Sequence, residues 1–164
     1  MNLYIIRHAW AEDRDDSHWP NDDLRPLTTD GKERFAQVVR HLVRRGITPR
    51  IIATSPLTRC VETAGLVAAG LPEGPKIVEL DVLRPGSDLE GLLRWTIRQA
   101  DRHEEIAWVG HAPDVSRLAA AMIGEGDSLI RFTKGALAAI RFDEPPALGG
   151  GELQWLVTAK LLGV

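Results

Sequence analysis

Short apolar runs that alternate with helical patterns are the feature that most limits the folds open to this chain. The runs cover residues 3–6, 51–53, 77–80 and 106–109, and apolar residues recur at helical spacing after each of them. Strands that alternate with helices favour crossover units, in which a largely parallel sheet carries helices on both faces. The sequence therefore predicts an α/β fold, a three-layer α/β/α sandwich around a mostly parallel central sheet.

Four main helices are expected. The first has Thr29 as its candidate N-cap, ahead of an apolar stripe that includes Phe35. The second is predicted to begin with Ser55 as N-cap and Pro56 as the first helical residue, which places Arg59 near the positive end of the helix dipole. The other two follow apolar stripes over residues 89–100 and 115–122.

Two further strands are expected near the C-terminus, at residues 137–142 and 153–158, on either side of a Pro- and Gly-rich loop at 144–151. They either lie beside each other or are separate members of the sheet. In both cases the sheet has about six strands. Residues 12–23, by contrast, are polar and acidic without apolar periodicity, which predicts a long surface loop after the first strand.

Length and composition limit the class of protein. The 164 residues suffice for one core and not for two independent ones, so a single domain over residues 1–164 is expected. A formal net charge of −3 without a basic stripe argues against nucleic acid as a partner. The lone Cys60 and the absence of a signal-peptide pattern predict a cytoplasmic location. No window approaches the roughly eighteen apolar residues of a membrane span, so no membrane association is expected.

Basic side chains stand where three of the predicted strands end. Arg7 and His8 follow the first run, the segment Ser55-Pro56-Leu57-Thr58-Arg59 follows the second, and His111 follows the fourth. The carboxyl ends of parallel strands meet at one edge of a sheet. We therefore expect two arginines and two histidines to converge there.

Such a cluster suits phosphoryl transfer. Guanidinium groups such as those of Arg7 and Arg59 bind phosphate oxygens bidentately and stay charged. A neutral imidazole attacks phosphorus to form a covalent phosphohistidine that water then hydrolyses, and His8 is the predicted nucleophile. His111 in its cationic form would donate hydrogen bonds to the phosphoryl oxygens in the transition state.

Several rival interpretations use the same residues. Arg59 could instead pair with Glu62 on the helix surface, and His111 could be a turn residue before Pro113. No pair among the five histidines has the spacing of a zinc site, so neither a metal nor another cofactor is expected. Cys60 lacks the arginine six positions on that a cysteine phosphatase needs, and a small buried thiol is predicted.

Taken together, the motifs resemble those of the histidine phosphatase superfamily, the phosphoglycerate mutase-like family. Its Arg-His-Gly signature stands here as Arg7-His8-Ala9. The other landmarks follow in order as Leu27-Thr28-Thr29-Asp30-Gly31, Ser55-Pro56-Leu57-Thr58-Arg59 with Glu62-Thr63-Ala64, Leu83-Arg84-Pro85-Gly86 and Val109-Gly110-His111-Ala112-Pro113. The short length and the segment Arg25-Pro26-Leu27-Thr28 are most similar to the small SixA-type phosphohistidine phosphatases.

The resemblance implies roles for individual residues. It makes His8 the nucleophile and forms the phosphate pocket from Arg7, Arg59 and His111. Ala112 and Arg25 are added as expected substrate-binding residues.

Two departures from the family pattern matter for the chemistry. Ala9 replaces the usual glycine, which makes a positive backbone φ less comfortable there. Larger members carry a glutamate general acid after the third strand, where this chain has Val82 and Leu83, so a leaving group of high pKa would lack its proton donor. The acidic loop offers three replacement donors, which are Asp22, Glu12 and Asp23, with Asp22 closest to the SixA-type pattern.

The resemblance implies a metal-independent phosphatase, a hydrolase of phosphoric monoesters or phosphoramidates with a covalent phosphohistidine intermediate. A phosphohistidine protein in signal transduction is the leading substrate, because a P–N bond breaks readily once the leaving ring is protonated. The alternatives are a phosphatase of small phosphate esters or anhydrides, and a non-catalytic module that binds a phosphorylated partner. Trp10 and Trp19 flank the acidic loop and are either a wall against a protein substrate or core residues.

Overall fold

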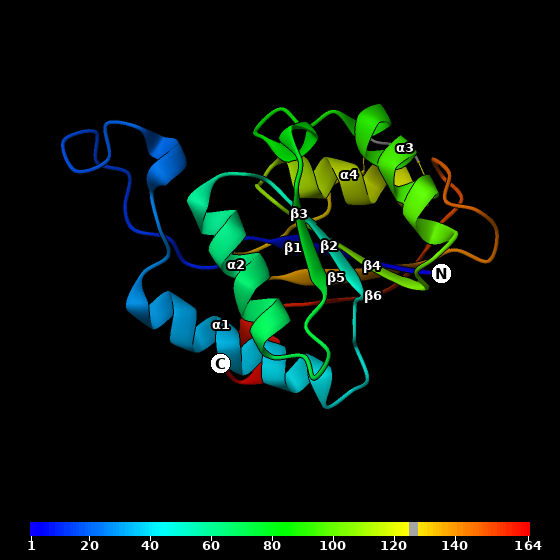
Figure 1. Cartoon of the computed structure of the whole chain (residues 1–164), viewed down its shortest axis with the longest axis horizontal. Helices are drawn as coiled ribbons and strands as arrows, with labels where there is room; N and C mark the ends of the chain where they lie inside the picture. The colour runs from blue at the N-terminus through cyan, green and yellow to red at the C-terminus, as the bar shows by residue number, and fades with distance from the viewer. Residues whose placement is uncertain (125–127) are drawn as a thin grey trace.

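A six-stranded sheet runs through the computed structural model, which describes residues 1–124 and 128–164 (Figure 1). Its strands are β1 (Asn2–Arg7), β2 (Ile51–Thr54), β3 (Lys76–Glu79), β4 (Glu105–Gly110), β5 (Leu137–Arg141) and β6 (Glu152–Val157), in the order β3-β2-β4-β1-β5-β6. The first four strands run parallel to one another, whereas β5 is antiparallel to β1 and β6 is antiparallel to β5. The predicted α/β class with a mostly parallel sheet is confirmed, and the two C-terminal strands lie beside each other.

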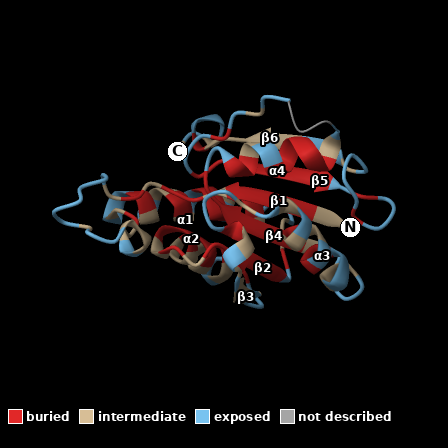
Figure 2. Ribbon diagram, turned by 90° about the horizontal axis from the view of Figure 1, so that it is seen from above, coloured by how far each residue is buried: buried red, intermediate tan, exposed pale blue. Residues whose placement is uncertain are grey.

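Helices cover both faces of this sheet (Figures 1 and 2). One face carries α1 (Thr29–Val43) and α2 (Thr58–Ala69), and the other carries α3 (Leu89–Ala100) and α4 (Asp114–Ile123). Three short 3₁₀ turns complete the described elements, namely η1 (Asp22–Leu24), η2 (Asp81–Leu83) and η3 (Ala159–Leu162). Within the described ranges, no helix combines the length and the apolar character that crossing a membrane requires.

The central strands are buried on both faces, which explains why they read as continuous apolar runs. In β1, Tyr4 and Ile6 pack with the core beneath α1 and α2, whereas Leu3 and Ile5 pack with the core beneath α3 and α4. Side chains alternate between the faces of a strand, so one short run serves two cores.

Two helix starts differ from the prediction. The N-cap of α1 is Thr28 and not Thr29, since the Thr28 hydroxyl accepts a hydrogen bond from the Gly31 amide at 2.9 Å. The expected start of α2 at Ser55 is wrong as well, because the helix begins at Thr58 with Leu57 at the N-cap position. Ser55 instead directly follows β2 at the carboxyl edge of the sheet, where its amide donates to the Val109 carbonyl at 3.0 Å.

The acidic stretch between β1 and α1 forms the expected long loop, which projects beyond the body of the molecule in blue in Figure 1. A single antiparallel bridge between Ala11 and Leu27 closes its base. Its last part folds back as η1, capped by the side chain of Asn21, and this return brings Asp22 toward the carboxyl edge of the sheet.

Candidate active site

Backbone pairing at the carboxyl edge of the sheet brings the three basic motifs together. Arg7 stands opposite Gly110 in the parallel register of β1 and β4, and the His8 amide donates to the Gly110 carbonyl at 3.0 Å. The His8 carbonyl in turn accepts from the Gly135 amide at 3.1 Å. His8 is therefore fixed between two segments, and His111 follows directly on the neighbouring strand.

His8 is held as a neutral ring with one free nitrogen. Its side chain is buried, and Nδ1 lies 2.7 Å from the carbonyl oxygen of Ala9. A carbonyl oxygen only accepts hydrogen bonds, so Nδ1 carries the hydrogen and Nε2 keeps its lone pair. Burial lowers the pKa of His8 to about 3; the hydrogen bond to Ala9 opposes this shift, and nearby positive charges add to it. This is the protonation state that a nucleophilic imidazole needs.

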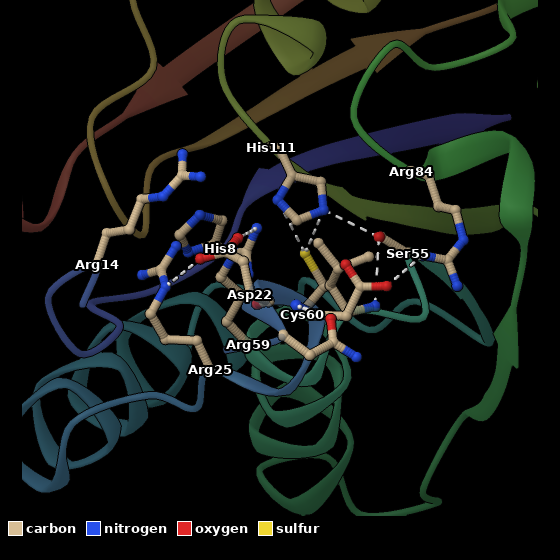
Figure 3. A network of polar contacts seen from close by, with 12 residues as sticks. His8, Arg14, Asp22, Arg25, Ser55, Arg59, Cys60, Arg84 and His111 are labelled. Atoms are coloured by element: carbon tan, nitrogen blue, oxygen red, sulfur yellow. Dashed lines mark hydrogen bonds and ion pairs between the residues drawn. The ribbon is translucent and has the colours of Figure 1, made fainter. Parts of the chain in front are cut away.

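His111 lies against His8, with 5.4 Å between the ring centroids and 60° between the ring planes. Its Nε2 is 2.9 Å from the hydroxyl of Ser55 and 3.5 Å from the sulfur of Cys60, as the dashed lines of Figure 3 show. Burial, and next the charge of Arg59, lower the pKa of His111 to about 4. The cationic form that the sequence analysis expects is therefore not the form of the unliganded protein.

Arg59 is buried and Arg7 is half-buried, and each of these two arginines has a buried donor atom without a partner in the described part of the chain. Arg59, the second residue of α2, is only 4% exposed, and Arg7 donates from Nη1 to the carbonyl of Phe132 at 2.8 Å. Among the described residues, the buried side-chain atoms without a hydrogen-bond partner are the Nε atoms of Arg7 and Arg59. Unpaired buried donors are costly, and donors on two cations are best satisfied by an anion.

An acidic side chain from η1 already contacts one of these cations. An Asp22 carboxylate oxygen lies 3.1 Å from Nη2 of Arg59, and the Asp22 carbonyl accepts from Nη1 of the same arginine at 2.9 Å. Arg25 donates from Nε to the Asp22 carboxylate at 2.7 Å. The hydrogen bond from Arg25, and then the charge of Arg59, hold the pKa of Asp22 below its usual range, although partial burial opposes the shift. Asp22 is thus ionised in the unliganded protein.

The other two expected proton donors are placed differently. The carboxylate of Asp23 pairs with Arg84 at 2.7 Å. Glu12 contributes its backbone carbonyl, which accepts from Arg25 at 2.7 Å. Of the three candidates, Asp22 is the one whose carboxylate contacts the arginine cluster.

Ala9 fits the site without a glycine. It is fully buried, and no residue other than glycine has a positive φ among those described, so the replacement brings no left-handed strain. The Ala9 amide donates to the hydroxyl of Thr63 at 3.1 Å, and that hydroxyl donates to the Arg59 carbonyl at 2.6 Å. Thr63 therefore ties the first motif to the second, a role that the sequence analysis missed. Its position four residues after Arg59 in one helix is the local signal for half of this link.

Contacts decide the rival interpretation of Arg59, and they show where Trp10 packs. Glu62 does not pair with Arg59, because its carboxylate accepts from the Leu27 amide and from Lys32, both at 2.6 Å. Trp10 packs with the core beneath α1, with the guanidinium carbon of Arg34 4.2 Å from the centroid of the Trp10 ring.

The predicted burial of Cys60 is confirmed, and burial raises the pKa of its thiol to about 12. In the two described ranges, no three His, Cys, Asp or Glu side chains are grouped so as to hold a metal ion.

The sequence analysis did not predict the contact between Ser55 and His111. The expected N-cap hydroxyl lies instead against His111, a residue 56 positions away. No local pattern carries that information, because the contact depends on β2 and β4 being neighbours.

Structures of similar shape include several phosphatases. The protein histidine phosphatase SixA complexed with tungstate superposes with a TM-score of 0.86 at 24% identity, over 99% of each chain. The alpha-ribazole phosphatase from Shigella flexneri gives 0.69 at 18% identity over 97% of each chain. A phosphoserine phosphatase from Entamoeba histolytica gives 0.64 at 15% identity over 96% of each chain. At these identities the likeness establishes the fold.

Sequence comparison reaches further than shape. An uncharacterized protein of Picosynechococcus sp. is 34% identical over 143 residues, which cover 86% of this chain and 85% of that protein. Residues 3–143 match the family model of the histidine phosphatase superfamily, branch 1. This span includes both histidines, both arginines and the loop that carries Asp22. The enzyme class is thus that of a phosphatase, as the motifs predict, and the chain belongs to branch 1 of the histidine phosphatase superfamily.

Proposed function

We propose that the chain is a phosphohistidine phosphatase that works through a covalent phosphohistidine on His8. The observation that carries the proposal is the state of this ring, which is neutral, buried and free at Nε2 beside two arginines whose buried Nε donors have no partner within the described ranges. A nucleophile and an anion pocket are the two parts that covalent phosphoryl transfer needs.

The first step transfers the phosphoryl group to the enzyme. Arg7 and Arg59 bind its oxygens, Nε2 of His8 attacks phosphorus, and the bond from phosphorus to the leaving nitrogen breaks. His111 is neutral in the unliganded site, but the negative charge of a bound phosphoryl group raises the pKa of a neighbouring imidazole and favours its donation of a hydrogen bond. In the second step water attacks phosphorus, the bond to Nε2 breaks and returns its electron pair to the ring, and dihydrogen phosphate leaves with the oxygen and both hydrogens of the water.

The choice of a P–N substrate is supported by the acids around the site. Asp22 is the carboxylate that contacts the arginine cluster, and it is ionised and engaged by two arginines. A leaving imidazole takes its proton from solvent before the bond breaks, whereas an alkoxide needs a positioned acid. The named function of SixA agrees with this choice, and the alpha-ribazole phosphatase represents the alternative, a small phosphate ester.

Pre-steady-state kinetics with p-nitrophenyl phosphate test the nucleophile, because this good leaving group needs no acid. We expect a burst of about one nitrophenolate per site and an acid-labile phosphate on the protein. His8→Gln should remove the burst and lower turnover by roughly 1,000-fold or more. His103→Gln, in the turn before β4, is the matched control and should keep the burst.

Three substrates compared side by side test the specificity. Hydrolysis of a peptide phosphorylated on histidine should exceed that of a phosphoserine peptide and of a sugar phosphate in kcat/KM. Equal or better turnover of the sugar phosphate would favour the small-ester alternative. Tight phosphate binding with no burst and no label on His8 would favour a binding module and contradict catalysis.

A further inference from the structure

A groove opens beside the phosphate pocket that the proposed chemistry leaves unused. It encloses about 720 Å³ between the first turn of α4 and the segment that leads into β5. One wall includes Ala112 and Arg117, and the other includes Leu129, Arg131 and Phe132.

Both walls are attached to the residues that would hold the phosphoryl group. Ala112 is exposed and follows His111 directly in the chain. Phe132, at the other wall, accepts the hydrogen bond from Arg7 through its carbonyl oxygen. A phosphorylated residue bound at His8 would therefore extend its neighbours toward this groove.

The walls combine an apolar surface with positive charge. Leu129 is fully exposed, at 101% of its reference area, and Ile130 beside it is only partly covered. Arg117 and Arg131 are both exposed, and the described lining residues include no carboxylate. Arg117 is oriented by the buried carboxylate of Asp114 at 3.5 Å, although 67% of its side chain stays exposed. A groove of this kind complements an apolar side chain that is flanked by carboxylates.

We infer that this groove binds an acidic and apolar segment of a protein substrate, next to the phosphorylated residue. The inference rests on the proposed function and specifies its substrate class as protein. A fully exposed leucine between arginines is typical of a surface that a polypeptide covers, since apolar anchors with charged rims recur in protein interfaces.

The test uses two peptides that differ in charge alone. Each is phosphorylated with phosphoramidate on its single histidine. One carries leucine and two glutamates beside that histidine, and the other has lysines in place of the glutamates. We expect the acidic peptide to be hydrolysed with about 10-fold higher kcat/KM, and this preference to shrink as salt rises.

Charge reversal in the groove should abolish the preference. In the double variant Arg117→Glu and Arg131→Glu, the ratio of kcat/KM for the acidic peptide over the lysine peptide should fall by about 10-fold or more, because attraction becomes repulsion. Leu129→Ala should lower kcat/KM for both peptides alike. The control reverses two exposed arginines elsewhere, Arg44→Glu and Arg98→Glu, and should keep the wild-type ratio.

The p-nitrophenyl phosphate burst separates failure of this inference from failure of the proposed function. The amplitude of the burst gives the fraction of sites that accept a phosphoryl group. The kcat/KM of each variant is divided by the burst amplitude of that variant. A normal burst together with equal rates on both peptides would overturn the docking groove alone. The same loss of ratio in the control variant would also overturn it, whereas absence of the burst would contradict the phosphatase mechanism itself.

Discussion

Burial decides the protonation of both histidines in the candidate site. An exposed histidine titrates near 6.5, but the pKa of His8 is lowered to about 3 and that of His111 to about 4. Because both pKa values are lowered, the neutral forms persist as the pH falls well below 6.5. The proposed nucleophile, His8, therefore stays neutral in mildly acidic solution.

This protonation state predicts the pH dependence of the first chemical step. The burst rate with p-nitrophenyl phosphate, corrected for titration of the substrate, should stay nearly constant from pH 7.5 to about 5 and fall only below that. Stopped-flow measurements across this range check it. A half-maximal rate near pH 6.5 would show that His8 titrates as an exposed histidine and would contradict the prediction.

The hydroxyl of Ser55 is expected to orient His111. The two side chains are buried and lie 2.9 Å apart, so removal of the hydroxyl leaves Nε2 of the ring with the weak sulfur partner Cys60. Ser55→Ala should lower kcat by about 10-fold, the worth of one buried hydrogen bond, and change KM less. Ser55→Thr keeps the hydroxyl and should restore most of the rate. Equal losses in both variants would indicate a packing role instead.

At the scale of elements, the start of α2 shows what a local pattern can predict. A Ser-Pro pair is typical of a helix N-terminus, yet α2 begins at Thr58. The amide of Ser55 pairs with Val109, and its hydroxyl lies 2.9 Å from His111 and accepts only a long hydrogen bond of 3.5 Å from the Leu57 amide. The strands and helices follow from the local periodicity of apolar residues. The meeting of the basic motifs at the carboxyl edge of the sheet follows from the parallel topology that the alternation of strands with helices predicts. Contacts such as Asp22 with Arg59, 37 positions apart, depend on how a loop folds back and have no local signal.

The turn η1 places the carboxylate of Asp22 against Arg59, a cation of the proposed phosphate pocket. Asp22 is ionised and contacts Arg59, so it competes with an anion for this cation and repels it. Asp22→Asn should therefore lower the inhibition constant of inorganic phosphate by roughly 5-fold, a change of about 1 kcal/mol. Asp13→Asn, an exposed position of the same loop, is the control and should leave the constant unchanged. Weaker inhibition by phosphate in Asp22→Asn would mean that Asp22 holds Arg59 in its binding position.

For the molecule as a whole, the site is a cost to stability that the two cores must offset. Two histidines and Arg59 are buried at the edge where the layers meet, and the buried Nε donors of Arg7 and Arg59 have no hydrogen-bond partner among the described residues. Buried histidines with lowered pKa values make the free energy of unfolding depend on pH, because they bind protons in the unfolded chain and do not bind them in the folded chain. Function and stability are thus coupled through the same side chains.

The sign of this dependence follows from the direction of the shifts. Below about pH 6.5 an unfolded histidine is protonated, whereas His8 and His111 stay neutral in the folded protein until about pH 3 and 4. The free energy of unfolding should therefore fall with decreasing pH in this window, by up to about 1.4 kcal/mol per pH unit for each histidine. Urea unfolding at pH 7 and pH 5 measures this fall in the free energy of unfolding.

In the double variant His8→Gln and His111→Gln the fall should be smaller, while His18→Gln and His103→Gln should match the wild type. The lowered pKa of Asp22 acts in all these proteins in a similar way and largely cancels in the comparison. An equal fall in the wild type and the site variant would show that these two histidines are protonated in the folded protein, and would remove the basis for His8 as a neutral nucleophile.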